Sequence, residues 1–482
     1  MSKSILISRT LGECRVALLH DGVPVEILVD HQQNQSLVGT IYLGKVERVL
    51  MGMQSAFVQI GQEKTAFLHF ADVPKSATKS PPTKTPLQAG EWVMVQVTKD
   101  AVHAKGARLT TDLALSGHYL VYLPLSHGYV GASNKLDSAK QRRLKKTLRA
   151  LLNKQFVQGG LVARSNAAQA SEDELSAEVE RLLSLWQQTL AQKAAHHQSK
   201  SQFVPLYQRP ALPMRCLLDW ADVDTQIVID DEALFQDSVR FCQTWLPFVV
   251  PNIMYHAEQT SLFDSHAVEA ALQNALQKRV ELKLGGYLLI EQTEAMTTVD
   301  VNTGSFVGKH SLEQTAYQIN LQATQVIAHQ LRLRNIGGIV IVDFIDMSKP
   351  DHREQVVKSL KAHLASDPAK TNIVHISPLG LVEMTRKRTA HTLVQQLCQP
   401  CAVCQGTGVV RRIETVSFEI CRKLMVMART YPCQSLTVIT DKAVAEYLQT
   451  TQIMTDLALL LNKTINIQTQ QLCHGQYSLQ FA

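Results

Sequence analysis

The run Gly337-Gly-Ile-Val-Ile-Val342 is the feature that most restricts the fold of this chain. Four consecutive β-branched apolar residues behind two glycines are typical of a strand buried on both faces, which occurs mainly in sheets covered by helices. The elements expected around it are helices over 264–283, 311–335 and 353–365 and strands over 287–292 and 296–302. Because strands alternate with helices here, the sequence predicts an α/β sheet in this part of the chain.

The sequence patterns in the rest of the chain predict further domains, with β-sheet, helical and α+β structure. Its length of 482 residues corresponds to about three domains. Short alternating runs predict an antiparallel meander over 4–30 and a small closed barrel with strands within 39–70 and 92–99, interrupted by a solvated loop at 74–88. Helices follow at 140–149 and 171–193, then a polar loop at 194–202, and a small α+β segment after Cys404. The Ser171/Glu174 pair predicts a capping box for the second of these helices.

Charge and apolar content exclude several classes of protein. No apolar run reaches the roughly 18 residues of a membrane span, and residues 1–13 lack the apolar stretch of a signal peptide. Nine scattered cysteines differ from the framework of a small secreted domain. The net charge of +6 permits a polyanionic partner. We therefore expect a cytoplasmic multidomain protein without a membrane span.

Two aspartates stand on neighbouring predicted strands. Asp300 lies within the strand 296–302, and Asp343 directly follows the apolar run. Two carboxylates on adjacent strands make an oxygen site that suits Mg²⁺, and Asn302, two residues from Asp300, faces the same side and could orient it. The alternative is that one aspartate caps the following turn, and Asp346 is the commoner case of such a cap.

The cysteines of the segment Cys398-Gln-Pro-Cys401-Ala-Val-Cys404 differ from the six isolated ones. A Cys-x-x-Cys before a glycine-rich turn is half of a tetrahedral zinc site. Because the chain has no second such pair beyond this segment, either Cys398 and a histidine complete the site or a second subunit supplies the other thiolates. We expect one Zn²⁺ shared by two chains across a twofold axis. The alternative is a redox dithiol.

The predicted barrel carries aromatic and cationic residues on or near its strands: Phe57, Phe67, Lys45, Lys99, Lys105 and Arg108. Aromatic side chains that stack on bases, with cations for phosphates, are what single-stranded nucleic acid binding requires. Either phenylalanine alone is more typical of a core residue, and it is the combination with the cations that favours RNA binding. The basic segments 140–149 and 385–389 are weaker candidates for phosphate contacts.

Together these motifs resemble the ribonuclease E/G family. The matching stretches, in collinear order over essentially the whole chain, are Gly44–Val49, Ala56–Gly61, Lys105–Thr111, Gly285–Gly304, Leu331–Met347, Gly380–Thr389 and the Cys401/Cys404 element. The chain ends soon after its small C-terminal segment, without a long scaffold tail, which favours the G branch of the family.

The resemblance implies a multidomain α/β and α+β architecture. In order, it implies an RNase H-like domain split into 1–37 and 207–277, an S1 RNA-binding barrel with the OB fold over 38–117, a 5′-sensor region over 118–206, a DNase I-like catalytic α/β domain over 278–397, a zinc link over 398–412 and a small α+β domain over 413–482.

The resemblance also assigns roles to individual residues. It makes Asp300 and Asp343 magnesium ligands and Asn302 the residue that orients the first of them. It makes Phe57, Phe67, Lys99 and Lys105 RNA contacts of the barrel, and Arg164 with Ser165 the pair that binds a 5′-monophosphate. The chain departs from the family in having serine instead of threonine at 165, no proline directly after Cys401, and the additional Cys398.

The activity that the resemblance implies is Mg²⁺-dependent hydrolysis of single-stranded RNA. An endoribonuclease of this kind leaves 5′-phosphate and 3′-hydroxyl ends, favours A/U-rich sites and 5′-monophosphorylated RNA, and acts on rRNA precursors, tRNA precursors and mRNA. We expect a zinc-linked homodimer, or a tetramer built from it. The alternatives are a non-catalytic S1-type RNA-binding protein and a metal-dependent phosphatase.

Overall fold

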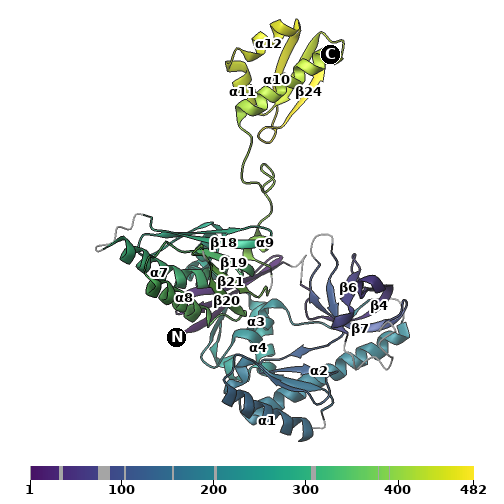
Figure 1. Cartoon of the computed structure of the whole chain (residues 1–482). Helices are drawn as coiled ribbons and strands as arrows, with labels where there is room; N and C mark the ends of the chain where they lie inside the picture. The colour runs from purple at the N-terminus through teal and green to yellow at the C-terminus, as the bar shows by residue number, and fades with distance from the viewer. Residues whose placement is uncertain are drawn as a thin grey trace. The chain divides into compact units, whose positions relative to one another are not determined.

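The computed structural model describes residues 2–31, 36–73, 87–101, 105–154, 157–199, 203–304, 311–377, 379–389 and 391–481 (Figure 1). The chain forms two compact units, Met1–Leu393 and Val394–Ala482. Most of the solvated loop expected at 74–88 lies outside the described residues. Each unit is described separately below.

The first sheet of unit 1 is built from two segments far apart in the sequence. Its strand order is β15-β14-β1-β2-β3. The strands are β1 (Lys3–Thr10), β2 (Glu13–His20), β3 (Val23–His31), β14 (Gln226–Ile229) and β15 (Ile253–Tyr255). Because β1, β2 and β3 pair antiparallel, the predicted meander is confirmed, while β14 pairs parallel with β1. Helices α3 (Leu212–Trp220) and α4 (Glu232–Trp245) contribute buried apolar residues to the core of this sheet.

The second sheet closes on itself as the predicted small barrel. Five strands form the ring β4-β5-β6-β8-β7, which β7 closes by pairing with β4, and β13 (Pro205–Tyr207) adds to the outside of β4. The ring strands are β4 (Ile41–Leu50), β5 (Ser55–Gln59), β6 (Ala66–His69), β7 (Trp92–Lys99) and β8 (Arg108–Thr110). A closed five-stranded barrel has the architecture of an OB fold.

A third, four-stranded sheet follows the barrel. Its order is β11-β12-β10-β9, from β9 (Leu115–Ser116), β10 (Leu120–Leu123), β11 (Val130–Ala132) and β12 (Gly160–Ala163). Helices α1 (Ser138–Lys154) and α2 (Glu172–Ser199) share a core with it. The capping box is confirmed, since Ser171 and Glu174 exchange hydrogen bonds. The loop predicted from residue 194 is wrong in its first part, because α2 continues to Ser199 through Ala, Gln and other residues that favour helices.

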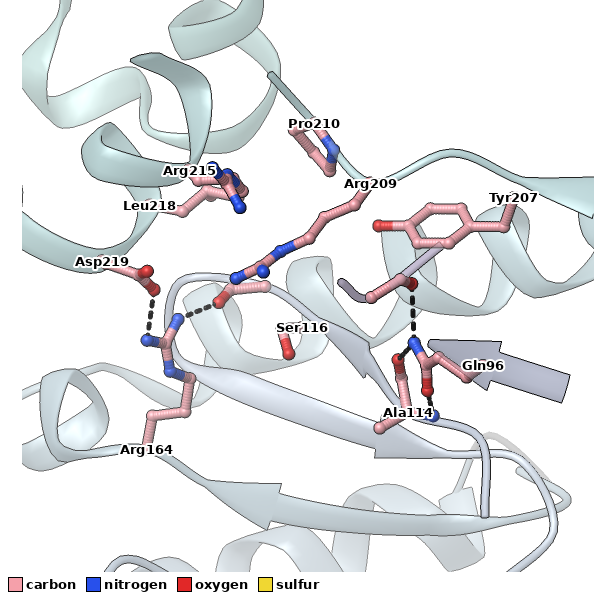
Figure 2. A pocket seen from close by; sticks show the side chains of 12 residues that line it. Gln96, Ala114, Ser116, Arg164, Tyr207, Arg209, Pro210, Arg215, Leu218 and Asp219 are labelled. Carbon is pink, nitrogen blue, oxygen red and sulfur yellow. Dashed lines mark hydrogen bonds and ion pairs between the residues drawn. The ribbon is translucent and has the colours of Figure 1, made fainter. Parts of the chain in front are cut away.

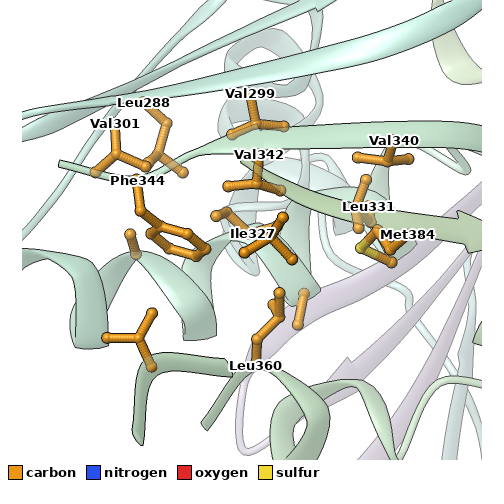
Figure 3. Packing of buried hydrophobic residues seen from close by; sticks show 14 of the residues in the cluster. Leu288, Val299, Val301, Ile327, Leu331, Val340, Val342, Phe344, Leu360 and Met384 are labelled. Carbon is orange, nitrogen blue, oxygen red and sulfur yellow. The ribbon is translucent and has the colours of Figure 1, made fainter. Parts of the chain in front are cut away.

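The fourth sheet is the predicted α/β sheet, with strand order β16-β17-β18-β19-β21-β20. Its strands are β16 (Arg279–Glu281), β17 (Tyr287–Gln292), β18 (Met296–Asn302), β19 (Gly338–Asp343), β20 (Thr371–Ile376) and β21 (Val382–Arg386). Helices α7 (Leu312–Leu333) and α8 (Pro350–Leu364) pack against it. Figure 3 shows the resulting core, in which valines of β18 and β19 meet Ile327 and Leu331 of α7 and Leu360 of α8.

The single helix predicted over 264–283 is wrong. The segment forms α5 (Leu262–Ser265), α6 (Val268–Leu276) and then β16. Ala267 interrupts the helix with a left-handed backbone, at φ +54°. Beyond Gln277 the chain pairs with β17, because strand pairing at the sheet edge satisfies its backbone groups better than one more helical turn would.

Unit 2 is a small α+β domain, as predicted from its sequence. It begins within the short helix α9 (Leu393–Leu397), and its three-stranded sheet has the order β23-β22-β24. The strands are β22 (Ser435–Thr440), β23 (Thr464–Thr469) and β24 (Tyr477–Phe481). Helices α10 (Ile413–Thr430), α11 (Lys442–Thr450) and α12 (Ile453–Leu461) bury their apolar residues in the same core.

Candidate functional site

The pairing of β18 with β19 brings Asp300 and Asp343 together. The two strands run parallel, and Asp300 is the register partner of Asp343. Alternation along each strand buries Val299, Val301 and Val342 and leaves both aspartates exposed on the opposite face. Asn302 donates from its side-chain nitrogen to Asp300 Oδ2 at 2.9 Å. The structure therefore gathers the three residues that the sequence singled out as a possible Mg²⁺ site.

The electrostatics of this pair favour a cation. Partial burial, with the charges of Asp300 and Asp346, raises the pKa of Asp343 above its ordinary value. Among the described residues, no ion pair of Asp300 or Asp343 with a basic side chain is formed. Two carboxylates are a donor set that suits Mg²⁺, which takes one or two carboxylates and keeps several waters. The residues present therefore fit this ion.

The loop after Asp343 is held by residues that the sequence analysis did not identify. Asn320 of α7 is fully buried, and its amide donates to the carbonyl oxygen of Ile345 at 2.8 Å and accepts from the Ile345 N–H at 3.1 Å. A polar residue at a core position of an amphipathic helix was the sequence signal that could have revealed it.

Glu313, at the start of α7, holds the next part of the same loop. Its carboxylate accepts from the N–H and hydroxyl of Ser348 and from the N–H of Lys349, and it contacts His352 Nδ1 at 2.8 Å. These bonds lower the pKa of Glu313 to about 2. The alternative in which Asp346 caps this turn is not what the structure shows, because Glu313 accepts from the N–H groups of Ser348 and Lys349, and Asp346 makes no hydrogen bond among the described residues.

The barrel presents its aromatic and basic residues in one row across adjacent strands. Register pairing joins Arg48 to Phe57, Phe57 to Phe67, Phe67 to Arg108 and Arg108 to Lys99. The phenylalanine rings are half-exposed and meet edge to face, with centroids 6.0 Å apart, and the Arg48 guanidinium lies 5.1 Å from the centre of the Phe57 ring. We call these five residues the barrel row. The barrel row therefore offers two aromatic rings on which bases can stack, with cationic side chains on either side.

Two of the predicted cations differ from the others in this region. Arg108 is paired with Asp72 at 2.8 Å, so its charge is largely offset. Lys105 is exposed but lies outside the barrel row, in the segment before β8. Arg48 was not identified from the sequence, because only strand pairing places it beside Phe57.

Arg164 and Ser165 follow β12 but take different positions. The Arg164 guanidinium donates to the carbonyl oxygen of Gly117 and pairs with Asp219 of α3, both at 2.5 Å. It lines a pocket of about 140 Å³, which Figure 2 shows from close by. Ser165 is exposed and does not line this pocket.

The cysteine segment forms a tight turn after α9. The carbonyl oxygens of Cys401 and Cys404 accept from the N–H groups of Gln405 and Thr407, and Gln405 has φ +50°. Backbone hydrogen bonds from Cys404 and Val403 lower the pKa of the Cys401 thiol, which favours the thiolate that zinc requires. The donor set of this turn fits half of a zinc site. Among the described residues, no cluster of three or more metal-binding side chains is present.

In the parts of the chain that the structure describes, no helix has both the length and the apolar character needed to cross a membrane.

Comparison with known proteins gives consistent matches over the whole chain. The profile described as "Ribonuclease E/G family" matches residues 114–389, and the profile "RNase E/G, Thioredoxin-like domain" matches residues 400–472. The chain is 39% identical to ribonuclease G of Haemophilus influenzae over 97% of this chain and 96% of that protein, and 39% identical to ribonuclease G of Escherichia coli K12 over 98% of both. It is 30% identical to ribonuclease E of Escherichia coli K12 over 92% of this chain and 42% of that protein.

The contacts of Asn320 predict that replacing it will lower both the stability of the protein and its turnover number, kcat. Asn320→Leu leaves the N–H and C=O of Ile345 without partners, at roughly 1–3 kcal/mol for each group. We expect the free energy of unfolding in urea to fall by about 3 kcal/mol. We also expect kcat for RNA cleavage to fall about 10-fold or more with little change in KM, because the loop that follows Asp343 moves.

Thr324→Val is the matched control for this variant. Thr324 is also fully buried on α7, but it bonds to Leu321 and Ser359 and does not touch the loop. The Thr324→Val variant should therefore have a lower free energy of unfolding than the wild-type protein but the same kcat. Equal losses of kcat in the two variants would show that Asn320 acts only on stability.

Proposed function

The chain belongs to the ribonuclease E/G family and is an endoribonuclease, and from this premise we propose that it hydrolyses single-stranded RNA with Mg²⁺ to give 5′-phosphate and 3′-hydroxyl ends. The observation that carries the proposal is the register pairing of Asp300 with Asp343 on the exposed face of the α/β sheet. We propose A/U-rich sites and 5′-monophosphorylated RNA as preferred substrates. Maturation of rRNA 5′ ends and processing or decay of other transcripts in the cytoplasm are the proposed roles.

The architecture supports the domain assignment that we propose. The sheet that combines 3–31 with 226–255 would be the split RNase H-like domain, and the closed barrel the S1 domain. The sheet between 115 and 163 would belong to the 5′-sensor region, and the sheet from β16 to β21 to the DNase I-like catalytic domain. The proposed boundaries remain those stated from the sequence.

In the proposed mechanism, Asp300 and Asp343 would hold the metal ion, and Asn302 orients Asp300 by donating to its Oδ2. The chemistry that a bound Mg²⁺ supplies here is positive charge, which favours ionisation of the attacking water and offsets the charge that develops on the phosphate. Asn320 and Glu313 hold the loop that follows Asp343, so that this carboxylate keeps its position beside Asp300. The water attacks the phosphorus in line, and the RNA 3′-oxygen leaves.

The barrel row supports selection of single strands. Phe57 and Phe67 can stack only on bases that are not paired within a duplex, while Arg48 and Lys99 at either end of the barrel row can contact phosphates. Lys105 is proposed as a further phosphate contact outside the barrel row. A non-catalytic S1-type RNA-binding protein would need this surface but not the paired carboxylates.

The catalytic assignment predicts loss of cleavage without loss of binding. Asp300→Asn and Asp343→Asn each remove a ligand charge from the metal site and leave the barrel unchanged. We expect no detectable cleavage of a 5′-monophosphorylated, A/U-rich single-stranded RNA in excess Mg²⁺. The RNA dissociation constant, measured without divalent ions, should change less than about threefold. Asp346→Asn, three residues after Asp343 in the sequence, is the control and should retain cleavage.

A rate near that of the wild-type protein in either variant would show that the substituted aspartate is not a ligand. If the wild-type protein itself bound RNA but cleaved nothing with any Mg²⁺ concentration, the non-catalytic alternative would hold.

The proposed contact with the RNA 5′ end predicts a substrate-dependent defect. Arg164 would form charge-assisted hydrogen bonds to a terminal monophosphate, and the exposed Ser165 hydroxyl would add one more. Arg164→Ala should therefore slow cleavage of 5′-monophosphorylated RNA about 10-fold more than cleavage of the 5′-hydroxyl form, and Ser165→Ala should have a smaller effect of the same kind. Parallel rate measurements on the two RNAs test this.

Arg143→Ala is the matched control, because Arg143 also bonds to a backbone carbonyl oxygen in this region, that of Ala168. It should slow both substrates equally or not at all. Equal slowing of both RNAs by Arg164→Ala would make Arg164 a general phosphate contact.

Ligand counting predicts a zinc ion shared between two chains. One turn offers Cys401 and Cys404, two thiolates of the four that a closed structural site requires, and a twofold axis presents the same turn twice. Metal analysis should give about half a zinc per chain. The double variant Cys401→Ser, Cys404→Ser should release the zinc and shift the protein towards monomer in sedimentation.

Cys398→Ser is the matched control, since Cys398 lies directly after α9 in the same segment. Loss of zinc in this variant would make Cys398 a ligand within the shared site. One zinc per chain, or a double variant that remains a tight dimer, would contradict sharing.

A further inference from the structure

The exposed face of the α/β sheet carries an aromatic side chain next to the paired carboxylates. Tyr287 of β17 is the register partner of Asn302 of β18, whose amide donates to Asp300. Because register partners point to the same face of a sheet, Tyr287 lies on the face of Asp300, while the next residue, Leu288, is buried on the other face. Tyr287 is the one aromatic residue in the strands β16, β17, β18 and β19.

Strand pairing places Tyr287 within reach of the proposed metal ligands. Tyr287 is diagonally opposite Asp300 across the antiparallel pair of β17 and β18. Diagonal neighbours of such a pair lie roughly 7–8 Å apart, a distance that an aromatic side chain can span. The direct register partner of Asp300 is Leu289, a half-buried apolar residue. A nucleotide that adjoins a phosphate held at Asp300 can therefore reach the Tyr287 ring across an apolar surface.

Arg279 of β16 lies over the Tyr287 ring. Its guanidinium carbon is 3.7 Å from the centre of the ring. The Nε of Arg279 donates to Glu281 at 2.6 Å, and Glu281 is the register partner of Tyr287, so this ion pair holds the guanidinium beside the ring. The Arg279 side chain nevertheless stays 54% exposed, and its Nη groups make no hydrogen bond among the described residues. We call Arg279 and Tyr287 the stacking pair.

The stability of the fold does not account for the stacking pair. Neither residue belongs to the apolar core of the α/β sheet, and the ion pair of Arg279 with Glu281 is exposed, so solvent screens it. A guanidinium over an aromatic ring instead gives a planar, cationic surface. Unpaired bases of RNA stack on aromatic side chains and on arginine planes, which this surface combines beside the carboxylates.

We propose that the stacking pair binds the base of a nucleotide that flanks the scissile phosphate. The base adds a further layer to the stack, and it can do so only when it is not paired within a duplex. Because every base has a π face, this contact favours single strands at the cleaved position without selecting one base. The inference rests on the proposed cleavage at Asp300 and Asp343 and adds a substrate contact on the catalytic sheet itself.

The test compares cleavage of single-stranded RNAs that carry one abasic ribonucleotide. The cleaved phosphate is mapped in the intact RNA, and the abasic nucleotide is then placed in turn at the nearest positions on either side. The abasic ratio is kcat/KM for the intact RNA divided by kcat/KM for the abasic RNA. In the wild-type protein it should be about 10 at one position that flanks the cleaved phosphate, because that base no longer stacks. In Tyr287→Leu it should fall below about 3 at this position.

Three further variants separate stacking from charge. Tyr287→Phe keeps the ring and should keep the abasic ratio. Arg279→Lys keeps the charge but not the plane, and should lower the ratio as Tyr287→Leu does. Lys278→Ala is the matched control, because Lys278 also pairs with a carboxylate of β17, that of Glu291 at 2.8 Å, but lies over no ring among the described residues. It should leave both kcat/KM and the abasic ratio unchanged.

A purely structural role of Tyr287 would give a different result. Tyr287→Leu would then slow cleavage of the intact and abasic RNAs by the same factor, and the abasic ratio would stay near that of the wild-type protein at every position. That outcome would overturn the proposal even if the variant were slow or less stable. Abasic ratios at positions that contact the barrel row should not respond to Tyr287→Leu.

Binding without divalent ions separates this inference from the proposed cleavage. The probe is a single-stranded RNA with 2-aminopurine at each position in turn, since the fluorescence of this base falls when it stacks. The wild-type protein and Asp300→Asn should both quench it at a position where Tyr287→Leu does not. Such quenching by a protein that cleaved nothing would contradict the proposed cleavage and still support the base contact. Quenching that Tyr287→Leu left unchanged at every position would overturn the base contact alone.

Discussion

The parallel pairing of β18 with β19 is the interaction on which the candidate catalytic centre depends. Buried valines on both strands pack against α7 and α8, and each contributes about 1.5–3 kcal/mol by leaving water. A shift of register by one residue would move these valines to the exposed face, so the core holds the register. The same register places Asp300 beside Asp343, and partial burial together with the charges of Asp300 and Asp346 raises the pKa of Asp343.

Helix α7 then serves the centre in two ways. Its apolar residues cover the sheet, and its polar residues Glu313 and Asn320 hold the loop that leaves β19. Because these side chains hold the part-buried backbone groups of Ile345 and the N–H groups of Ser348 and Lys349, the loop has little freedom to carry Asp343 away from Asp300. One helix therefore provides both the core of the α/β domain and the positioning of its proposed ligand.

RNA recognition, as we propose it, uses surfaces that depend on strand pairing elsewhere in unit 1. The barrel row exists because β4, β5, β6, β8 and β7 align Arg48, Phe57, Phe67 and Lys99 across a closed sheet. The pocket that Arg164 lines, together with Arg209 and Arg215, lies where this barrel meets β9 and α3. Stacking faces and phosphate contacts would thus be distributed over one compact unit, which is an arrangement suited to a flexible single strand.

Local sequence patterns determined the elements and the chemistry-bearing residues of this protein. Side-chain periodicity and turn residues are local properties, so several features could be identified from the sequence alone. They are the apolar run before Asp343, the period-two strands of the barrel and the Cys401/Cys404 turn. The tertiary structure alone decided which of these residues meet. Strand pairing replaced the end of the helix predicted over 264–283 with β16 and brought Arg48 over the ring of Phe57. Helix packing brought the Asn320 amide within hydrogen-bond distance of Ile345, and Arg209 and Arg215 line the same pocket. Such contacts join residues of different strands, helices and loops, and only the packing of whole sheets and helices determines which of them form.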